Sequence, residues 1–468
     1  MALKIRTHLF SYLALLGAFI SPHASARVTD IGLKCNDIPK ALTVDHVWGG
    51  TRVAFDALEN KGFIYIAYYD ADRWLSVAQV DKCSGTEKKI RIPSRFEGWD
   101  AHNSITLAFD NLNRLHVSGN MHVSPLVYAR MDTSDQLSGL DRVRSMVGQD
   151  ETQATYPYFF RFGDGSLGFA YRSGHSGDGV ELINRLVGSG WVRWTSTPVF
   201  APASEKNHVN AYHTEFLLGP DGFFHVAWVW REDYAVETNF NVNYAKSKDL
   251  RTWENSSGKI LPLPITPKSA EVVDFIPERS GLLNNIRLGF DGAGRPVISY
   301  LKFDASGATQ LFHARRDEAG WKSVAATRWT YRWDPRGGGT IVGEIGFSGV
   351  RQHDGQLIEQ VHQPEINSKT FVYDTDSLKL MEVRDPVHDD VTSTIAHRQG
   401  PAGMVLSLRN VRTGGTAAGP SDSHVISWFS RPADNRDKSR KCTTAAEPCN
   451  YVSELILSTI RSSSESRN

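Results

Sequence analysis

The segment Gly222-Phe223-Phe224-His225-Val226-Ala227-Trp228 carries the pattern from which the fold of this 468-residue chain is predicted. A turn glycine precedes a run in which apolar side chains recur at alternate positions, which predicts a β-strand that leaves a hairpin turn. The pattern recurs six more times, at residues 62–68, 113–118, 165–171, 294–300, 355–361 and 403–408.

These seven units follow one another at spacings of 48 to 72 residues, and no stretch reads as a long amphipathic helix. Repeats of this length predict an all-β fold, a seven-bladed β-propeller with four strands in each blade. A pair of β-sandwiches is the alternative, but the units are evenly distributed and no Pro/Ser-rich linker divides the chain. We expect residues 451–460, the last strand candidate, to complete the first blade and close the ring.

The N-terminal residues have the order of a secretory signal. Lys4 and Arg6 precede a twelve-residue apolar run, Leu9 to Ile20, and Ala24-Ser25-Ala26 resembles a cleavage site. The run is shorter than the roughly 20 residues that span a bilayer, although an uncleaved membrane anchor is the alternative. We therefore predict a signal peptide at 1–26, a propeller domain at 27–461 and a disordered tail at 462–468, in a protein that is secreted or periplasmic.

The composition excludes one class of partner. The chain contains 52 Lys and Arg residues against 52 Asp and Glu residues, so its formal net charge is zero. Neutralising a run of phosphates needs a basic excess, which argues against nucleic acid. We also expect no membrane partner, because no other long apolar run exists, and we expect a monomer.

Four cysteines are present, and in an exported protein they are expected to pair. Four cysteines allow three connectivities. Cys442 and Cys449 are seven residues apart in a polar segment, which favours a local bridge there and a second one between Cys35 and Cys83. The rival pairing joins the two ends of the chain. The spacing is not C-x-x-C, so a thiolate metal site is not expected.

Residues 100–130 hold the densest group of polar functional side chains, with His102, His116 and His122. His116 lies inside an alternating strand and is expected to pack in the core. His102 and Asn103 are expected to begin the strand before it, and His122 follows a turn. Because these strands are expected to be hairpin neighbours, His102 and His122 are predicted to approach one another, either as structural histidines or as functional ones.

A second group consists of Tyr156 and Arg172. Tyr156 precedes a proline, which predicts an extended backbone. Arg172 is expected to end an alternating strand before a Gly-rich loop. An arginine at a strand end can bind a carboxylate with two hydrogen bonds. A surface aromatic and a surface ion pair are the alternatives.

Several segments together resemble the BNR-repeat polysaccharide lyases that act on ulvan, families 24 and 25, the second being nearer. The segments are H-N-S-I at 102–105, L-H-V-S-G-N-M-H at 115–122, P-L-V-Y-A-R at 125–130, T-Y-P-Y-F at 155–159, Y-R-S-G-H-S-G-D-G at 171–179, H-V-A-W-V-W-R at 225–231 and R-L-G-F-D-G-A-G-R-P-V-I-S-Y at 287–300. The resemblance implies a seven-bladed propeller and a catalytic set at His102, His122, Tyr156 and Arg172. Some members bind a structural metal, whose ligands cannot be mapped onto this chain.

The chemistry that the resemblance implies is β-elimination at a uronate linked through O4. A base removes the C5 proton, and an acid protonates the leaving oxygen. His102 and Tyr156 are expected to be the base and the acid. Arg172 would neutralise the uronate carboxylate, helped by His122 and Asn103. No metal, nucleotide or redox cofactor is required, and the expected partner is an anionic polysaccharide.

Three other functions stay open at this point. The first is a lyase that acts on another rhamnose–uronate polymer. The second is a sialidase-like propeller glycosidase, which Arg91-Ile92-Pro93 suggests. The third is a propeller that binds glycans without cleaving them, because Trp and Tyr side chains would serve that role equally well.

Overall fold

The computed structural model describes residues 40–133, 137–202, 208–386, 395, 398–413, 423–440 and 451–460. The predicted signal peptide, the tail at 462–468 and the cysteines Cys35, Cys442 and Cys449 lie outside these residues, so the disulfide pairings stay predictions. Within the described residues, no helix has the length and the apolar character needed to cross a bilayer.

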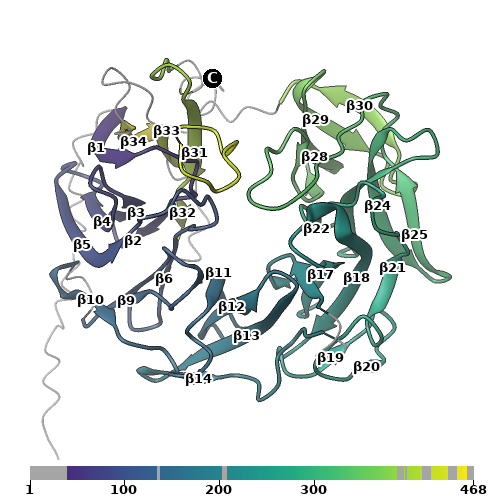
Figure 1. Cartoon of the computed structure of the whole chain (residues 1–468), viewed down its shortest axis with the longest axis horizontal. Helices are drawn as coiled ribbons and strands as arrows, with labels where there is room; N and C mark the ends of the chain where they lie inside the picture. Colours follow the sequence, from purple (N-terminus) through teal and green to yellow (C-terminus); the bar gives the residue numbers. More distant parts are fainter. Residues whose placement is uncertain are drawn as a thin grey trace, which may run out of the picture.

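The structure confirms an all-β propeller (Figure 1). The first sheets along the chain contain β2 (Asp56–Asn60), β3 (Phe63–Tyr69), β4 (Trp74–Asp81) and β5 (Glu87–Arg95); β6 (Thr106–Phe109), β7 (Leu115–Ser118), β9 (Tyr128–Met131) and β10 (Leu140–Val143); and β8 (His122–Ser124), β11 (Ala154–Arg161), β12 (Leu167–His175), β13 (Asp178–Val187) and β14 (Gly190–Arg193). A short strand, β32 (Arg412–Thr413), pairs in parallel with β2.

The next sheets contain β15 (Asn210–His213), β16 (Leu217–Leu218), β17 (Phe224–Arg231), β18 (Asn239–Ser247), β19 (Trp253–Glu254), β20 (Ile260–Leu261) and β21 (Glu271–Asp274); β22 (Arg287–Phe290), β23 (Pro296–Phe303), β24 (Thr309–Asp317) and β25 (Gly320–Ala325); and β26 (Gly346–Phe347), β27 (Arg351–His353), β28 (Gln356–Gln363), β29 (Asn367–Tyr373) and β30 (Leu380–Arg384). Two 3-10 turns, η1 (Leu137–Gly139) and η2 (Val236–Thr238), complete this part of the chain.

One further sheet joins the two ends of the chain. It contains β1 (Ala41–Trp48), β34 (Val452–Ile460), β33 (Ser423–Ser430) and β31 (Val405–Asn410), in that order. As expected, the last strand pairs with the first strand along the chain, β1. The sheet that β34 completes is, however, not the one built on the first recurring segment: the sheet of β2 to β5 has its own four strands, and β34 lies between β33 and β1.

Each of the seven recurring segments contributes one strand to a different sheet, namely β3, β7, β12, β17, β23, β28 and β31. Six sheets are built mainly from one continuous stretch of chain, and the seventh combines both ends. The number of seven blades stays a prediction. In β17 all eight residues are buried, which explains why its apolar run is nearly continuous. Gly222 has a φ of +78°, a turn conformation that glycine adopts without a Cβ clash.

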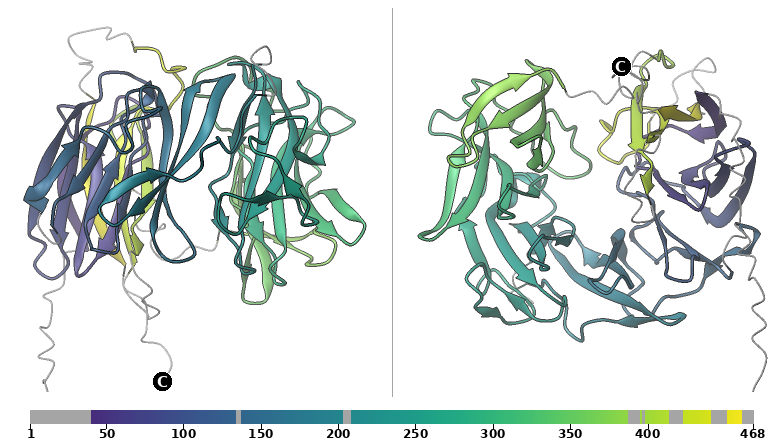
Figure 2. Two further views of the ribbon diagram at one scale, coloured as in Figure 1. Left: turned by 90° about the horizontal axis from the view of Figure 1, so that it is seen from below. Right: turned by 180° about the vertical axis from the view of Figure 1, so that it is seen from behind.

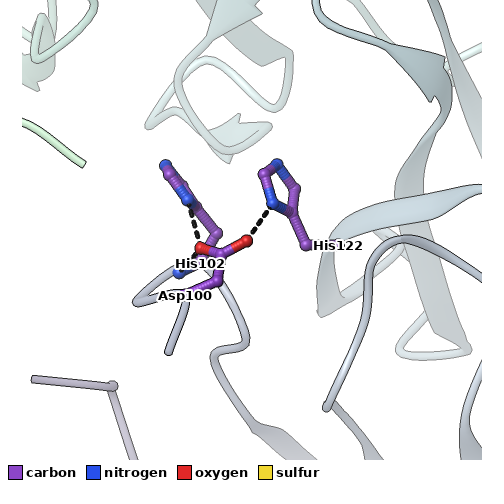
Figure 3. Close-up of side chains that lie close together, drawn as sticks. All are labelled: Asp100, His102 and His122. Atoms are coloured by element: carbon purple, nitrogen blue, oxygen red, sulfur yellow. Dashed lines mark hydrogen bonds and ion pairs between the residues drawn. The ribbon is translucent and has the colours of Figure 1, made fainter. Parts of the chain in front are cut away.

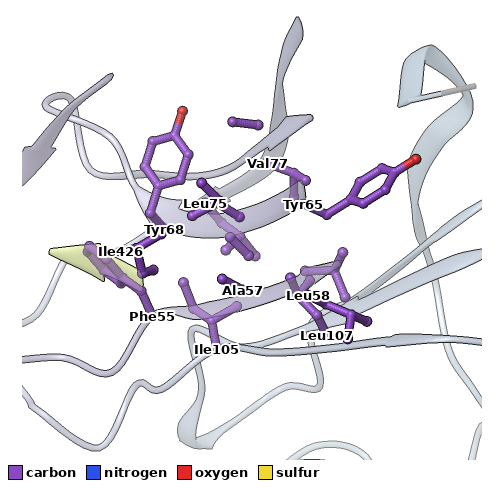
Figure 4. Close-up of a cluster of buried hydrophobic side chains, with 14 of the residues drawn as sticks. Phe55, Ala57, Leu58, Tyr65, Tyr68, Leu75, Val77, Ile105, Leu107 and Ile426 are labelled. Atoms are coloured by element: carbon purple, nitrogen blue, oxygen red, sulfur yellow. The ribbon is translucent and has the colours of Figure 1, made fainter. Parts of the chain in front are cut away.

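The core fills the spaces between neighbouring sheets. Figure 4 shows side chains of β2, β3 and β4 packed with Leu107 of β6 and Ile426 of β33, all of which belong to one buried cluster. Burying one such Leu or Ile contributes about 1.5–3 kcal/mol. Figure 2 shows the strands running from one face of the ring to the other, and Figure 1 places β6 and β11 toward the centre of the ring. This packing fixes the segments that carry the candidate site.

Candidate active site

The loop that precedes β6 holds His102 in a turn. The Asp100 carboxylate accepts a hydrogen bond from the His102 backbone N–H (2.8 Å), and its Oδ1 lies 2.6 Å from the Nδ1 atom of the His102 ring. The expectation that His102 and Asn103 begin a strand is therefore wrong, since β6 begins only at Thr106. The Asp100 carboxylate accepts the hydrogen bond of this backbone N–H, which keeps the segment in a turn.

His122 reaches the same carboxylate from another sheet. Its Nδ1 atom is hydrogen-bonded to Oδ2 of Asp100, and its ring stacks on that of His102 with the centroids 4.5 Å apart. Figure 3 shows Asp100 between the two rings. The predicted approach of His102 and His122 is confirmed, but by a different route: β8 pairs with β11 and not with the β6–β7 hairpin.

Tyr156 lies where β11 is irregular. Its φ is +54°, and the pairing of β11 with β12 shifts register between Thr155 and Tyr158. The expected extended backbone is therefore wrong at this position. Val123, beside His122, also has a positive φ, +52°. Such conformations are costly for residues with a Cβ and collect at functional sites.

The irregular backbone brings the Tyr156 ring to centroid distances of 5.8 Å from His102 and 6.2 Å from His122. Burial raises the pKa of Tyr156 to about 12, although the positive charges of Arg172 and Arg231 act in the opposite direction. The phenol is therefore protonated at neutral pH and can donate a proton.

Arg172 is buried and lies against Tyr156. Its side chain is 4% exposed, and the guanidinium carbon is 4.9 Å from the centroid of the Tyr156 ring. Nη1 donates a 3.4 Å hydrogen bond to the hydroxyl of Tyr212. The Nε atom has no hydrogen-bond partner, and no ion pair with an acidic side chain is found for Arg172 within the described residues. Arg172 also lies inside β12, which continues to His175, and not at the strand end as expected.

Two further residues of this group were not singled out in the sequence. Arg231, at the end of β17, is 8% exposed and stacks over the Tyr212 ring at 4.1 Å. Burial would raise the pKa of Tyr212, but Arg231 and Arg172 outweigh it and lower this pKa below its usual value. Arg231 could have been found from the sequence, because it ends an alternating strand, the pattern that was also used for Arg172. Tyr212 could not, because nothing in the sequence distinguishes it from a tyrosine of the core.

Two predicted residues have other surroundings. Asn103 is buried, and its amide donates to the backbone carbonyl of Asp100 (3.0 Å), so its part in substrate binding stays a prediction. His116 lies in the core as expected. Its Nδ1 atom is 2.8 Å from the Tyr128 hydroxyl, and its Nε2 atom is 3.2 Å from the Asp110 carboxylate.

These side chains border several hollows. His102 and Tyr156 line one pocket of 390 Å³ together with Arg231 and Arg287, and a second of 390 Å³ together with Arg172 and Tyr212. A third, of 510 Å³, begins at His102 and extends along Arg52 and Arg409. His102 therefore borders all three hollows, and each of them is also lined by at least one arginine.

Chain segments distant in sequence also meet beside His102. Asp437 accepts hydrogen bonds from the Thr340 backbone N–H (2.7 Å) and hydroxyl (2.6 Å). Its carboxylate also accepts a 3.4 Å hydrogen bond from the Ala101 N–H and lies 3.6 Å from Nδ1 of His102. The site therefore depends on three segments that the ring brings together.

One group of residues at the site has the side-chain types that bind metals. Among the described residues, possible ligand atoms of Asp100, His102 and His122 lie within 4.8 Å of one another. Both Nδ1 atoms already face carboxylate oxygens at hydrogen-bond separation, so a metal between them would have to displace both bonds. The structural metal that the sequence resemblance allows stays untested.

Comparison with known proteins agrees with this architecture. Residues 63–329, more than half of the chain, match the model described as "BNR repeat-containing family member". Among curated proteins, no sequence matches this chain.

Solved structures resemble the chain over most of its length. The polysaccharide lyase Uly1 is 13% identical with a TM-score of 0.55, and the match covers 90% of this chain and 98% of that one. A PL25 ulvan lyase is 12% identical with a TM-score of 0.53, covering 83% and 92%, and a second structure of it contains bound -[GlcA(1-4)Rha3S]-. The resemblance drawn from the sequence is thus confirmed. At these identities the likeness establishes the fold alone, and the residue roles stay predictions.

Proposed function

Because the chain belongs to the BNR repeat-containing family, we propose that it is an exported polysaccharide lyase that cleaves ulvan by β-elimination. The bond broken would link a rhamnose to O4 of a glucuronate or iduronate, and the product would carry an unsaturated uronate end. The observation that carries this proposal is a pair of buried arginines, Arg172 and Arg231, that have no acidic partner among the described residues.

A buried cation without an acidic partner is costly unless a ligand supplies the negative charge. A uronate carboxylate would supply it. The C5 proton of a uronate is weakly acidic because the neighbouring carboxylate is already negative. Pairing that carboxylate with Arg172 would stabilise the charge that develops when the proton leaves.

The neighbouring side chains supply the proton transfers. His102, with His122 beside it, is the proposed base, since an imidazole titrates near neutral pH. Tyr156 is the proposed acid that protonates the leaving O4, since its pKa of about 12 keeps the phenol protonated. Tyr212, with a lowered pKa between two arginines, would orient the carboxylate together with Arg172.

We also infer that the sheet of β1, β31, β33 and β34 is the seventh blade, and that the signal peptide at 1–26 directs export of a monomer. A sheet that joins both ends of the chain suits a closed ring, because the hydrogen bonds between β1 and β34 hold the N-terminal strand to the C-terminal strands.

Ultraviolet absorbance tests the proposal directly. An unsaturated uronate absorbs in the ultraviolet, so a lyase produces a rise during digestion of ulvan. Parallel digestions of other rhamnose–uronate polymers separate ulvan specificity from broader lyase activity. New reducing ends without a rise in absorbance would indicate a glycosidase, and binding without cleavage would indicate a lectin; either result would overturn the proposal.

A further inference from the structure

Asp100 contacts both histidines of the candidate site at once. Oδ1 faces the Nδ1 atom of His102 at 2.6 Å, and Oδ2 is hydrogen-bonded to the Nδ1 atom of His122. An ionised carboxylate only accepts hydrogen bonds. Both Nδ1 atoms must therefore carry the hydrogen.

The ionised state of Asp100 is consistent with its surroundings. Burial would raise the pKa of Asp100, but the hydrogen bonds from His102 and His122 outweigh burial and hold this pKa far below its usual range. The His102 backbone N–H donates a third hydrogen bond to the same carboxylate.

The opposite sides of the two rings are left open. Within the described residues, no hydrogen-bond partner is found for the Nε2 atom of His102 or of His122. Figure 3 shows both rings directed away from the carboxylate and toward the same side. In a neutral imidazole with a hydrogen on Nδ1, the Nε2 atom carries a lone pair.

We propose that Asp100 is a positioning residue that fixes both histidines with the proton on Nδ1, so that the two Nε2 lone pairs point to the same side, away from the carboxylate. The proposal deepens the proposed function, because it assigns the atom on each ring that would accept a proton. The rings are 4.5 Å apart, so two imidazolium charges would repel one another. The Asp100 carboxylate, which is hydrogen-bonded to both rings, would stabilise a single positive charge on the pair.

Other charged and titratable groups also face the pair. Asp437 approaches His102 from the C-terminal part of the chain, and Tyr156 contacts both rings from β11. Arg172 lies over the Tyr156 ring, and the positive charges of Arg172 and Arg231 lower the pKa of Tyr156. Among the described residues, Asp100 alone is hydrogen-bonded to both rings, which distinguishes it from its neighbours.

Nuclear magnetic resonance of ¹⁵N-labelled histidine rings measures the tautomers without any substrate. We expect two neutral rings with hydrogen on Nδ1 in the unsubstituted protein, assigned by their loss in His102→Gln and His122→Gln. Finding hydrogen on Nε2 in either ring would overturn the proposal. Stoichiometric zinc in the purified protein, whose removal by a chelator shifts both ring signals, would overturn it too, because the Nε2 atoms would then be metal ligands.

Asp100→Asn tests the consequence for the reaction. An amide offers one oxygen and one NH₂ group, so it can accept from only one Nδ1–H, and the other ring must move its proton to Nε2. We expect a loss of at least a hundredfold in kcat/KM, and the acidic limb of the pH profile should move to lower pH, because a negative charge beside the imidazolium is lost. If Asp100 had only a structural role, its replacement would lower kcat/KM without shifting the acidic limb of the pH profile.

Asp164→Asn is the matched control, since Asp164 is exposed in a turn outside the site. It should keep the wild-type profile. A folded Asp100→Asn with unchanged rate and unchanged acidic limb would overturn the proposal. If the unsubstituted protein cleaves no uronan, the proposed function fails, while the ring spectra still decide whether Asp100 fixes the tautomers.

Discussion

Replacing Tyr156 by phenylalanine removes one oxygen from the site and tests whether this side chain is the general acid. With a pKa of about 12, the phenol is ionised in only about one molecule in ten thousand at pH 8. It is therefore an acid over the whole neutral range and a poor base. Loss of a general acid lowers turnover by roughly 10²–10⁴-fold, or about 2.7–5.4 kcal/mol in activation free energy.

The assay compares two leaving groups in the same variant. On ulvan, Tyr156→Phe should lose at least a hundredfold in kcat by ultraviolet absorbance, because a sugar alkoxide needs a proton to leave. On a uronate that carries a nitrophenyl group at O4, the variant should retain most of its rate, because nitrophenolate leaves without a proton.

Tyr128→Phe serves as a control for loss of a buried hydroxyl, since Tyr128 contacts His116 in the core and lies outside the site. It should keep the wild-type rate on both substrates. An equal loss on both substrates in Tyr156→Phe would show that the hydroxyl does not act as the acid. A near-normal rate on ulvan in the folded variant would refute the assignment altogether.

Three more predictions concern the carboxylate partner, the core and the thiols. Arg172→Ala should lower kcat on ulvan by at least a hundredfold, since it leaves the developing charge uncompensated, and a loss confined to KM would contradict this role. His116→Gln should keep lyase activity but reduce stability. Burial lowers the pKa of His116, so the folded protein loses unfolding free energy as the pH falls below about 6.5, and urea unfolding at several pH values should show a flatter dependence in the variant. Peptide mapping without reductant should find Cys35 bonded to Cys83 and Cys442 to Cys449, and four free thiols would contradict both the pairing and the inferred export.

The sequence patterns predicted the strands because alternation and turn glycines are local properties. Each recurring unit falls in its own sheet for this reason. Pairing partners are not local, so the position of β34 between β33 and β1 could not be read from its residues.

Parts of the site were also predictable from the sequence. The expectation that two neighbouring strands of a hairpin carry His102 and His122 correctly predicted that the two rings lie close together. The strand that carries His122, β8, pairs with β11 instead of with that hairpin. The residue before a proline prefers an extended backbone, but this preference did not predict Tyr156. Its φ is +54°, at the point where the pairing of β11 with β12 shifts register. Tyr212 had no signal that separates it from a core tyrosine, because its distinguishing property is the proximity of two arginines from other strands.

The contact of Asp437 with Ala101 and Thr340 determines when the site can be completed during synthesis of the chain. Ala101 and Asp437 are 336 residues apart, and Thr340 and Asp437 are 97 apart. Contacts of such separation form late, since a long loop must close before they stabilise anything. During synthesis, the surroundings of His102 are therefore incomplete until almost the whole chain has been made. A chain that stops before its last sheet would carry every proposed catalytic side chain and still lack the contacts of Asp437 beside His102.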